Sequence, residues 1–97
     1  MKILAIEKSV PDIPDERFTD TLLREEARRV WEMYQSGVIR ELYFRSDRDA
    51  AVLVLECATI EQAGTALATL PLVRNGLIGF ELLPLRAYPG FERLFKE

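Results

Sequence analysis

The sequence predicts an α+β fold in which four strands and two helices follow one another in the order βαββαβ. Two observations predict it. Two segments show the apolar spacing of amphipathic helices, and short runs typical of strands flank each of them. The 97 residues are too few for more than one domain, so we expect a single domain that spans residues 1–97.

The first part of the chain predicts a strand followed by a long helix. Residues 2–8, KILAIEK, form a short apolar run with charges at its ends, which favours a strand. The prolines and aspartates of residues 9–16 predict a loop. In residues 17–37 apolar side chains recur at helical spacing; they are Leu23, Ala27, Val30, Trp31 and Tyr34. We expect this stripe, with Trp31, to be buried, and the charged run 24–29 to be solvated.

Residues 38–57 predict a β-hairpin. VIRELYFR, residues 38–45, alternates and is rich in β-branched and aromatic residues, and AAVLVLEC, residues 50–57, is a second strand. The segment SDRD between them predicts a turn. A turn centred on Asp47 and Arg48 sets four cross-strand pairs, which are Arg45 with Ala50, Tyr43 with Val52, Glu41 with Val54 and Ile39 with Glu56.

The remaining residues predict a second helix, a last strand and a tail. Thr59 and Gln62 have the spacing of a capping box, and the helix that they open is stopped by Pro71. Residues 77–85, LIGFELLPL, predict a strand that is apolar on both faces. The tail, residues 86–97, carries four apolar side chains, which are Tyr88, Phe91, Leu94 and Phe95. We expect the tail to be ordered and to dock on a neighbouring subunit.

Right-handed crossovers turn this order into a four-stranded antiparallel sheet with both helices on one face, the ferredoxin-like arrangement. The strand at 50–57 is apolar at six consecutive positions, Ala50 to Leu55, so both of its faces need cover. Two helices cover only one face. We therefore expect a homodimer, or a larger homo-oligomer, in which a second sheet covers the helix-free face and leaves a partly polar cavity.

The pairing predicts which side chains reach that cavity. From the hairpin, the residues expected on the helix-free face are Glu41, Tyr43, Arg45 and Glu56. Charge placement adds Glu7, together with Ile3 and Ala5, from the first strand. From the last strand it adds Glu81. Strand parity turns Arg40 toward the helices.

Composition excludes several classes of function. A net charge of −3 and a pI of about 5.0 argue against nucleic acid and anionic membrane surfaces as partners. No apolar run approaches the roughly 20 residues of a membrane span, so a cytoplasmic location is expected. Without histidine, a serine–histidine triad or a histidine-ligated zinc is impossible, and there is no nucleotide-binding motif. We expect no metal and no cofactor. Cys57, the single cysteine, is interpreted as a small core residue.

Three segments carry a resemblance to a known family. They are SGVIREL, the hairpin YFRSDRDAAVLVLE, and LATLPLV at the end of the second helix. Across residues 36–90 the chain resembles the muconolactone isomerase family of the dimeric α+β barrel group. The resemblance implies a dimeric barrel and a cofactor-independent, proton-shifting isomerase of a small lactone or another intermediate of aromatic catabolism.

Some residues match that family and others depart from it. Arg40 matches a family arginine, Tyr43 a family aromatic residue and Glu56 a family acidic position. The isomerases carry histidine near the second strand and around the hairpin turn, where this chain has Glu41 and Arg48. Transfer of the fold is therefore better supported than transfer of the activity.

The site that these observations predict lies on the helix-free face. Either Glu56 or Glu81 is the expected proton-transferring group, because an apolar neighbourhood raises the pKa of a carboxyl toward neutrality. The residues expected to position a small organic substrate are Tyr43, Arg45, Arg40 and Glu41. The competing interpretation is that these charges form salt bridges across the dimer.

Two other functions stay open at this stage. One is a cofactor-free monooxygenase of the same barrel group. The other is a protein that binds a small molecule, or serves assembly, without catalysis. The absence of histidine weakens the isomerase and monooxygenase interpretations, and it leaves the non-catalytic interpretation open.

Overall fold

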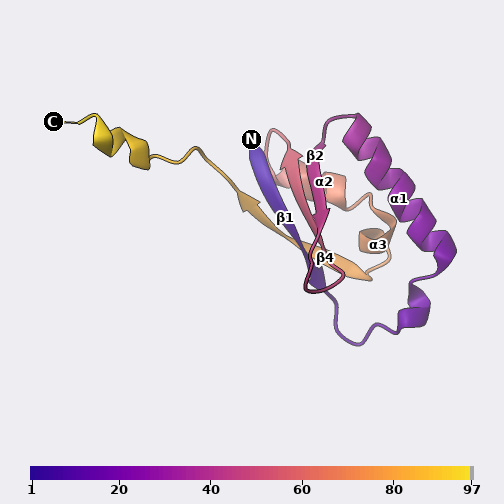
Figure 1. The fold of residues 1–97 in the computed structure, drawn as a ribbon. Coiled ribbons are helices and arrows are strands. Elements are labelled where there is room, and N and C mark those ends of the chain that lie inside the picture. Colours follow the sequence, from indigo (N-terminus) through magenta and orange to yellow (C-terminus); the bar gives the residue numbers. More distant parts are fainter. Residues whose placement is uncertain (97) are drawn as a thin grey trace.

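The computed structural model describes residues 1–96, and within them it contains one four-stranded antiparallel sheet with helices on one face (Figure 1). The strands lie in the order β2-β3-β1-β4. In chain order the elements are β1 (Lys2–Ser9), the 3-10 turn η1 (Asp15–Arg17), α1 (Asp20–Gln35), β2 (Ile39–Phe44), β3 (Ala51–Glu56), α2 (Ile60–Leu67), α3 (Pro71–Arg74), β4 (Ile78–Pro84) and the 3-10 turn η2 (Gly90–Leu94). The predicted order βαββαβ and the ferredoxin-like arrangement are confirmed.

Side-chain caps explain where the helices begin. Thr19 accepts a hydrogen bond from the backbone N–H of Leu22, and Thr59 accepts one from that of Gln62, at 3.1 and 3.0 Å. The second helix is shorter than predicted. It ends at Leu67, and Pro71 then opens the separate one-turn helix α3, where a proline at the first position loses no hydrogen bond.

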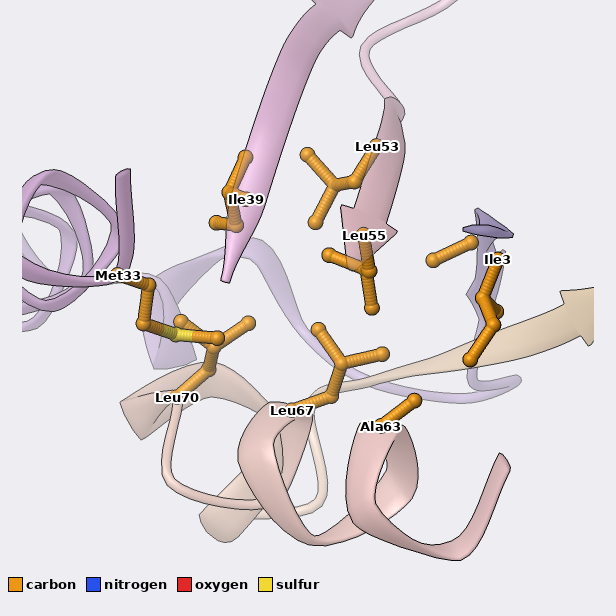
Figure 2. Packing of buried hydrophobic residues seen from close by; sticks show 9 residues of the cluster. Ile3, Met33, Ile39, Leu53, Leu55, Ala63, Leu67 and Leu70 are labelled. Carbon is orange, nitrogen blue, oxygen red and sulfur yellow. The ribbon is translucent and has the colours of Figure 1, made fainter. Parts of the chain in front are cut away.

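The core lies between the sheet and the helices (Figure 2). Sheet residues converge on Met33 of α1, on α2 and on Leu70; they are Ile3, Ala5, Ile39, Leu53 and Leu55. The predicted facing of β1 is therefore wrong. The strand register determines which face each β1 side chain occupies. Ile3 pairs with Leu55 and Ala5 with Leu53, so Ile3 and Ala5 face the helices, and alternation also puts Glu7 on the helix side.

A β-bulge changes the start of β2. The ladder shifts register between Ile39 and Glu41, and Arg40 is the extra residue. Ile39 consequently pairs with Leu55 and is buried against the helices, so the predicted pair of Ile39 with Glu56 is wrong. Past the bulge the predicted register is confirmed, with Glu41 opposite Val54.

α1 turns a different row of side chains inward than the sequence pattern suggested. Its inner row is Leu22, Glu26, Val30 and Met33, all half-buried or buried. The neighbouring outer row is Leu23, Ala27, Trp31 and Tyr34, all exposed. Trp31 is 59% exposed, so its predicted burial is wrong within a single chain. The prediction that the charged run 24–29 is solvated is also wrong in part. Glu26 and Arg29 are half-buried, and Arg29 Nε donates a hydrogen bond to Thr69 Oγ1 at 2.9 Å.

After β4 the chain leaves the body as an extended arm, residues 85–96, that ends in η2 (Figure 1). Its apolar side chains are exposed; they are Leu85, Tyr88, Phe91, Leu94 and Phe95. The arm gives the chain its length of 61 Å against 28 and 22 Å in the other two directions. Glu97, the last residue of the predicted tail, lies outside the described residues. In the described part of the chain, no helix is long and apolar enough to cross a membrane.

Candidate functional site

A large groove lies between α1 and the helix-side face of the sheet, at the β2 edge. Its volume is about 670 Å³. One wall is the outer row of α1, represented by Leu23, Trp31 and Tyr34, and the other consists of sheet residues, among them Leu42, Phe44 and Phe80. Leu42 and Phe44 lie on the helix side of β2 and are 43% and 67% exposed. The groove therefore has apolar walls and an open mouth.

Two carboxylates lie in this otherwise apolar groove, Glu7 from β1 and Glu26 from α1. Glu7 Oε1 accepts a hydrogen bond from the backbone N–H of Ala51, and Glu26 Oε1 accepts one from that of Leu72, both at 2.9 Å. Within residues 1–96 neither carboxylate forms an ion pair. Each is thus fixed by one backbone donor and keeps acceptor capacity for a ligand.

The surroundings of Glu26 change its acidity. Burial raises the pKa of Glu26 above its ordinary value, the Leu72 N–H counteracts this in part, and the negative charge of Glu7 raises it further. A carboxyl whose pKa is moved toward neutrality, inside an apolar groove, is suited to accept and return a proton. Glu26 is the described residue that best combines these two properties.

The groove continues beyond Glu7 into a second recess of about 640 Å³. The two share Glu7, Leu23 and Phe44, and the second is also bordered by Asp15 and Asp49. Among the residues that the structure describes, no lysine or arginine lines either part. The charged groups of the whole groove are therefore all acidic.

The predicted acids Glu56 and Glu81 lie on the helix-free face but not together. Glu56 pairs with Lys2 in the sheet and Glu81 pairs with Ile6, so about 13 Å of β1 separates them along the strand. Glu56 forms an ion pair with the Met1 ammonium. The hydrogen bond from the Met1 ammonium first, then the positive charges of that ammonium, Arg40 and Lys2, hold the pKa of Glu56 below its usual range.

The predicted positioning residues form three separate local contacts. Tyr43 donates a hydrogen bond to Glu41 at 2.9 Å, and this bond raises the pKa of the Tyr43 hydroxyl. Arg45 forms a two-pronged pair with Asp47 in the hairpin turn, at 2.8 and 2.6 Å. Arg40 Nε donates to the Gly37 carbonyl at 2.6 Å. In a single chain, these residues and the two predicted acids do not surround one cavity, and their functional role stays a prediction.

Sequence reasoning missed Glu26 and placed Glu7 on the opposite face of the sheet. The signal for Glu26 was present, because it lies three residues after Leu23 and four before Val30, inside the apolar periodicity of α1. An acidic residue inside an apolar helix stripe indicates a carboxyl that is buried when the helix packs on the sheet. Glu7 offered no comparable signal, since only the register of β1 decides its face. Cys57 packs at the margin of the core, as expected of a small apolar residue.

Comparison with known proteins establishes the fold. No family model and no curated protein matches the sequence. Among solved structures, that of muconolactone isomerase is similar, with a TM-score of 0.71 and 20% identity over 92% of each chain. A 5-chloro-2-hydroxyhydroquinone dehydrochlorinase from Burkholderia phenoliruptrix AC1100, in complex with 2,5-dihydroxybenzoquinone, has a TM-score of 0.59 and 13% identity over 93% of this chain and 98% of that one. The resemblance noted in the sequence is confirmed for the fold.

Proposed function

We propose that the chain is a small cofactor-independent enzyme that shifts a proton on a small lactone or another intermediate of aromatic catabolism. The substrate lies in the groove between α1 and the sheet, and Glu26 transfers the proton. One observation carries this proposal: the half-buried Glu26 carboxyl, held by Leu72 N–H, faces an apolar groove in which Glu7 raises its pKa further. The fold shared with muconolactone isomerase supports the class of chemistry.

The groove has the size and lining that such a substrate needs. Small-molecule sites have volumes of about 300–1,000 Å³ and mostly apolar walls with a few polar groups. The groove, at about 670 Å³, falls within this range. Apolar walls also lower the local dielectric constant beside the carboxylates, which strengthens their electrostatic interactions with a bound substrate.

The proposed reaction needs no redox partner. The ionised Glu26 takes a proton from the carbon next to a carbonyl, and the electron pair of the broken C–H bond moves into a conjugated enolate. The protonated Glu26 then returns the proton to another carbon of the conjugated system, so that a double bond changes position and no atom is lost. Tyr34 lines the same groove, and we assign to its hydroxyl the role of hydrogen-bond donor to the enolate oxygen.

We also propose that the chain assembles with further copies of itself, through its helix-free face and through its arm. The helix-free face carries apolar residues that are at most half-buried; they are Leu4, Ile6, Val52, Val54 and Leu83. A second sheet packed on them would form the barrel. The arm would then lie on a neighbour, because its residues 85–96 carry three cationic and one anionic side chain and so complement the acidic groove.

Replacement of Val54 by Asp tests the sheet interface. Val54 is half-buried at the centre of the helix-free face, and a charge there cannot be desolvated without cost. We expect the variant to run as a monomer, or to aggregate, in light scattering at micromolar concentration. A wild-type protein that is folded and monomeric under those conditions contradicts the proposed assembly.

Deuterium exchange tests the proposed chemistry. Small lactones, phenols and quinones that raise the melting temperature are incubated with the protein in D₂O, and exchange at carbon is followed by NMR. We expect Glu26→Gln, which keeps the size and the Leu72 contact, to lower the exchange rate by roughly 10²-fold or more. Glu56→Gln and Glu81→Gln serve as matched controls on the other face and are expected to retain the rate.

The opposite results point to other functions. Loss of exchange in Glu56→Gln or Glu81→Gln, with full exchange in Glu26→Gln, would move the chemistry to the helix-free face. Binding without exchange in the wild-type protein would leave a small-molecule binding protein without catalysis.

A further inference from the structure

We infer that a neighbouring copy of the chain completes the site, by laying its arm in the second recess and bringing Arg93 to the edge of the substrate. This inference rests on the proposed function for the position of the substrate, and it adds one catalytic residue to that site. The observations behind it are an open groove lined by acidic and apolar residues and an exposed arm of cationic and apolar ones.

The groove of a single chain lacks a cation that the proposed reaction would use. Proton removal moves the negative charge from Glu26 to the enolate oxygen, which then lies in the same groove as the negative charge of Glu7. Tyr34 offers this oxygen a hydrogen bond but no charge. Because no lysine or arginine among residues 1–96 lines the groove, the compensating cation has to come from another chain.

The arm of the same chain leaves from the wrong end of the sheet to fill its own groove. Leu85 N–H donates to the Lys2 carbonyl at 2.9 Å, at the start of β1, whereas the second recess lies at the far end of β1, beside Ser9 and Ile78. The arm then points away from the body (Figure 1). An arm that enters a groove therefore belongs to another copy, and each copy gives one arm and receives one.

Arg93 is the arm cation best placed to act in a neighbour's groove. Arg86 is the second residue after β4, so it stays near its own sheet. Lys96 forms an ion pair with Glu92 at 3.9 Å. Arg93 lies in η2, and within residues 1–96 it forms no ion pair.

The second recess matches the chemistry of η2. It offers apolar contacts to Phe91 and Phe95 of the arm, from residues that include Val10, Ile13, Phe18 and Leu77. Asp49 borders the same recess, and Glu7 lines both this recess and the substrate groove. A guanidinium beside Glu7 can donate to its carboxylate and, with the other prongs of its planar fork, to a substrate oxygen.

The arm is already shaped for docking before it meets a neighbour. Tyr88 and Phe91 pack edge to face, with ring centroids 5.1 Å apart. The Tyr88 ring also covers Gly90, where an added Cβ would come within 2.1 Å of the Tyr88 hydroxyl oxygen. The arm's own side chains thus hold η2 in place, so docking orders fewer free groups and costs less entropy.

A docked arm is compatible with Glu26 as the proton-transferring group. Burial is the largest cause of the raised pKa of Glu26, and apolar side chains of the arm add to that burial. The charge of Glu7 is the smallest cause, and it is the one that Arg93 would offset.

Mixing two impaired variants tests whether the site contains two copies. Arg93→Ala chains keep Glu26, and Glu26→Gln chains keep the arm cation. Each variant alone is expected to lose about 10²-fold in the rate of deuterium exchange. The two are mixed in equal amounts, unfolded in urea and refolded together. We expect about a quarter of the wild-type rate, because half of the grooves retain Glu26 and half of the arms retain Arg93.

Two further arm variants separate the role of Arg93 from general packing of the arm. Arg93→Lys keeps the charge and loses the planar fork, and it is expected to recover part of the rate lost in Arg93→Ala. Arg86→Ala removes the arm cation that stays near its own sheet, and it is expected to retain the rate.

Intermolecular broadening of NMR signals locates the arm without any turnover. A nitroxide is attached to Lys96→Cys chains that also carry Cys57→Ala, and these are refolded with methyl-labelled wild-type chains. We expect broadening of the Leu77 methyl signals in the second recess and little broadening of Val54 on the helix-free face. Arg93→Glu in the nitroxide chain should reduce the broadening, because it places like charges against each other.

Three results would overturn the inference. They are no broadening of Leu77, full exchange in Arg93→Ala, or no recovery in the refolded mixture although the wild-type protein exchanges. Failure of the proposed function is distinguishable, because it appears as a wild-type protein without exchange. Broadening of Leu77 in such a protein would uphold the docked arm and refute the chemistry.

Discussion

The two long helices cover the same face of the sheet in unequal ways. α2 presents Ala63 and Leu67, both buried, and the small alanine lets the helix approach the strands closely. α1 is twice as long, yet among its residues only Met33, at 1% exposure, is buried, and Trp31 and Tyr34 stay exposed beside the groove. The α2 half of the molecule is a closed core, whereas the α1 half is built as an open site.

The difference between the closed α2 half and the open α1 half indicates which part of the molecule stabilises the fold and which part binds ligands. In the closed half, apolar side chains interlock and any loss leaves a cavity. In the open half, apolar side chains face a groove that also holds two carboxylates, which a core would not tolerate without donors. Changes in the first half should therefore affect folding, and changes in the second should affect binding and assembly.

The largest expected effect is on the closed half. Leu67→Ala removes buried methyl groups from the centre of the core, and we expect it to lower the free energy of unfolding by about 2–5 kcal/mol in urea denaturation. Trp31→Ala is the matched change in the open half, and despite the larger side chain it should cost less than Leu67→Ala. Equal losses would show that α1 packs as tightly as α2.

The arm is expected to affect the open half, because a neighbour's arm is proposed to cover the groove there. Deletion of residues 86–97 removes apolar side chains whose burial contributes on the order of 3 kcal/mol or more. We expect a smaller assembly in light scattering and a lower melting temperature. Removal of residues 96–97 alone is the control and should change neither. An unchanged assembly and melt in the longer deletion contradict docking of the arm.

The smallest expected effect is a pH dependence that belongs to the open half. The folded-state pKa of Glu26 is raised, so folding favours its protonated form and stability falls as the pH rises through that pKa. We expect Glu26→Gln to flatten the decline in unfolding free energy between acidic and neutral pH and to stabilise the protein at pH 7. Glu25→Gln, on the exposed side of α1, should keep the wild-type profile. Superimposable profiles for Glu26→Gln and wild type would remove the argument for a tuned carboxyl.

The sequence was sufficient for the order of elements and for the hairpin register beyond the bulge. Periodicity, caps and turn residues act locally, so Thr19, Thr59 and Pro71 mark helix ends that a reader of the sequence can find. The facing of β1 could not be found in this way, since a one-residue change of register inverts every side chain. The charges at Glu7 and Glu81 suggested one face for both, and only Glu81 lies there.

The candidate site was harder to predict than the fold. Its position depends on how α1 rotates about its axis, and two adjacent rows of apolar residues on α1 made two rotations plausible. The structure turns the row of Val30 and Met33 inward and brings Glu26 with it. Whether Glu56 and its neighbours act on the helix-free face depends on a second subunit. The apolar pattern predicts that this face is covered, but it does not predict which partner residues would meet Glu56.

A methyl NMR titration with a small lactone that raises the melting temperature tests the central claim, that the groove under α1 is the ligand site, most directly. Leu42, Leu53 and Leu72 line the groove, whereas Val52, Val54 and Leu83 lie on the helix-free face. We expect saturable shifts of the first three methyl signals with little change in the second three. Shifts confined to Val52, Val54 and Leu83 would place the ligand between the sheets and contradict the account.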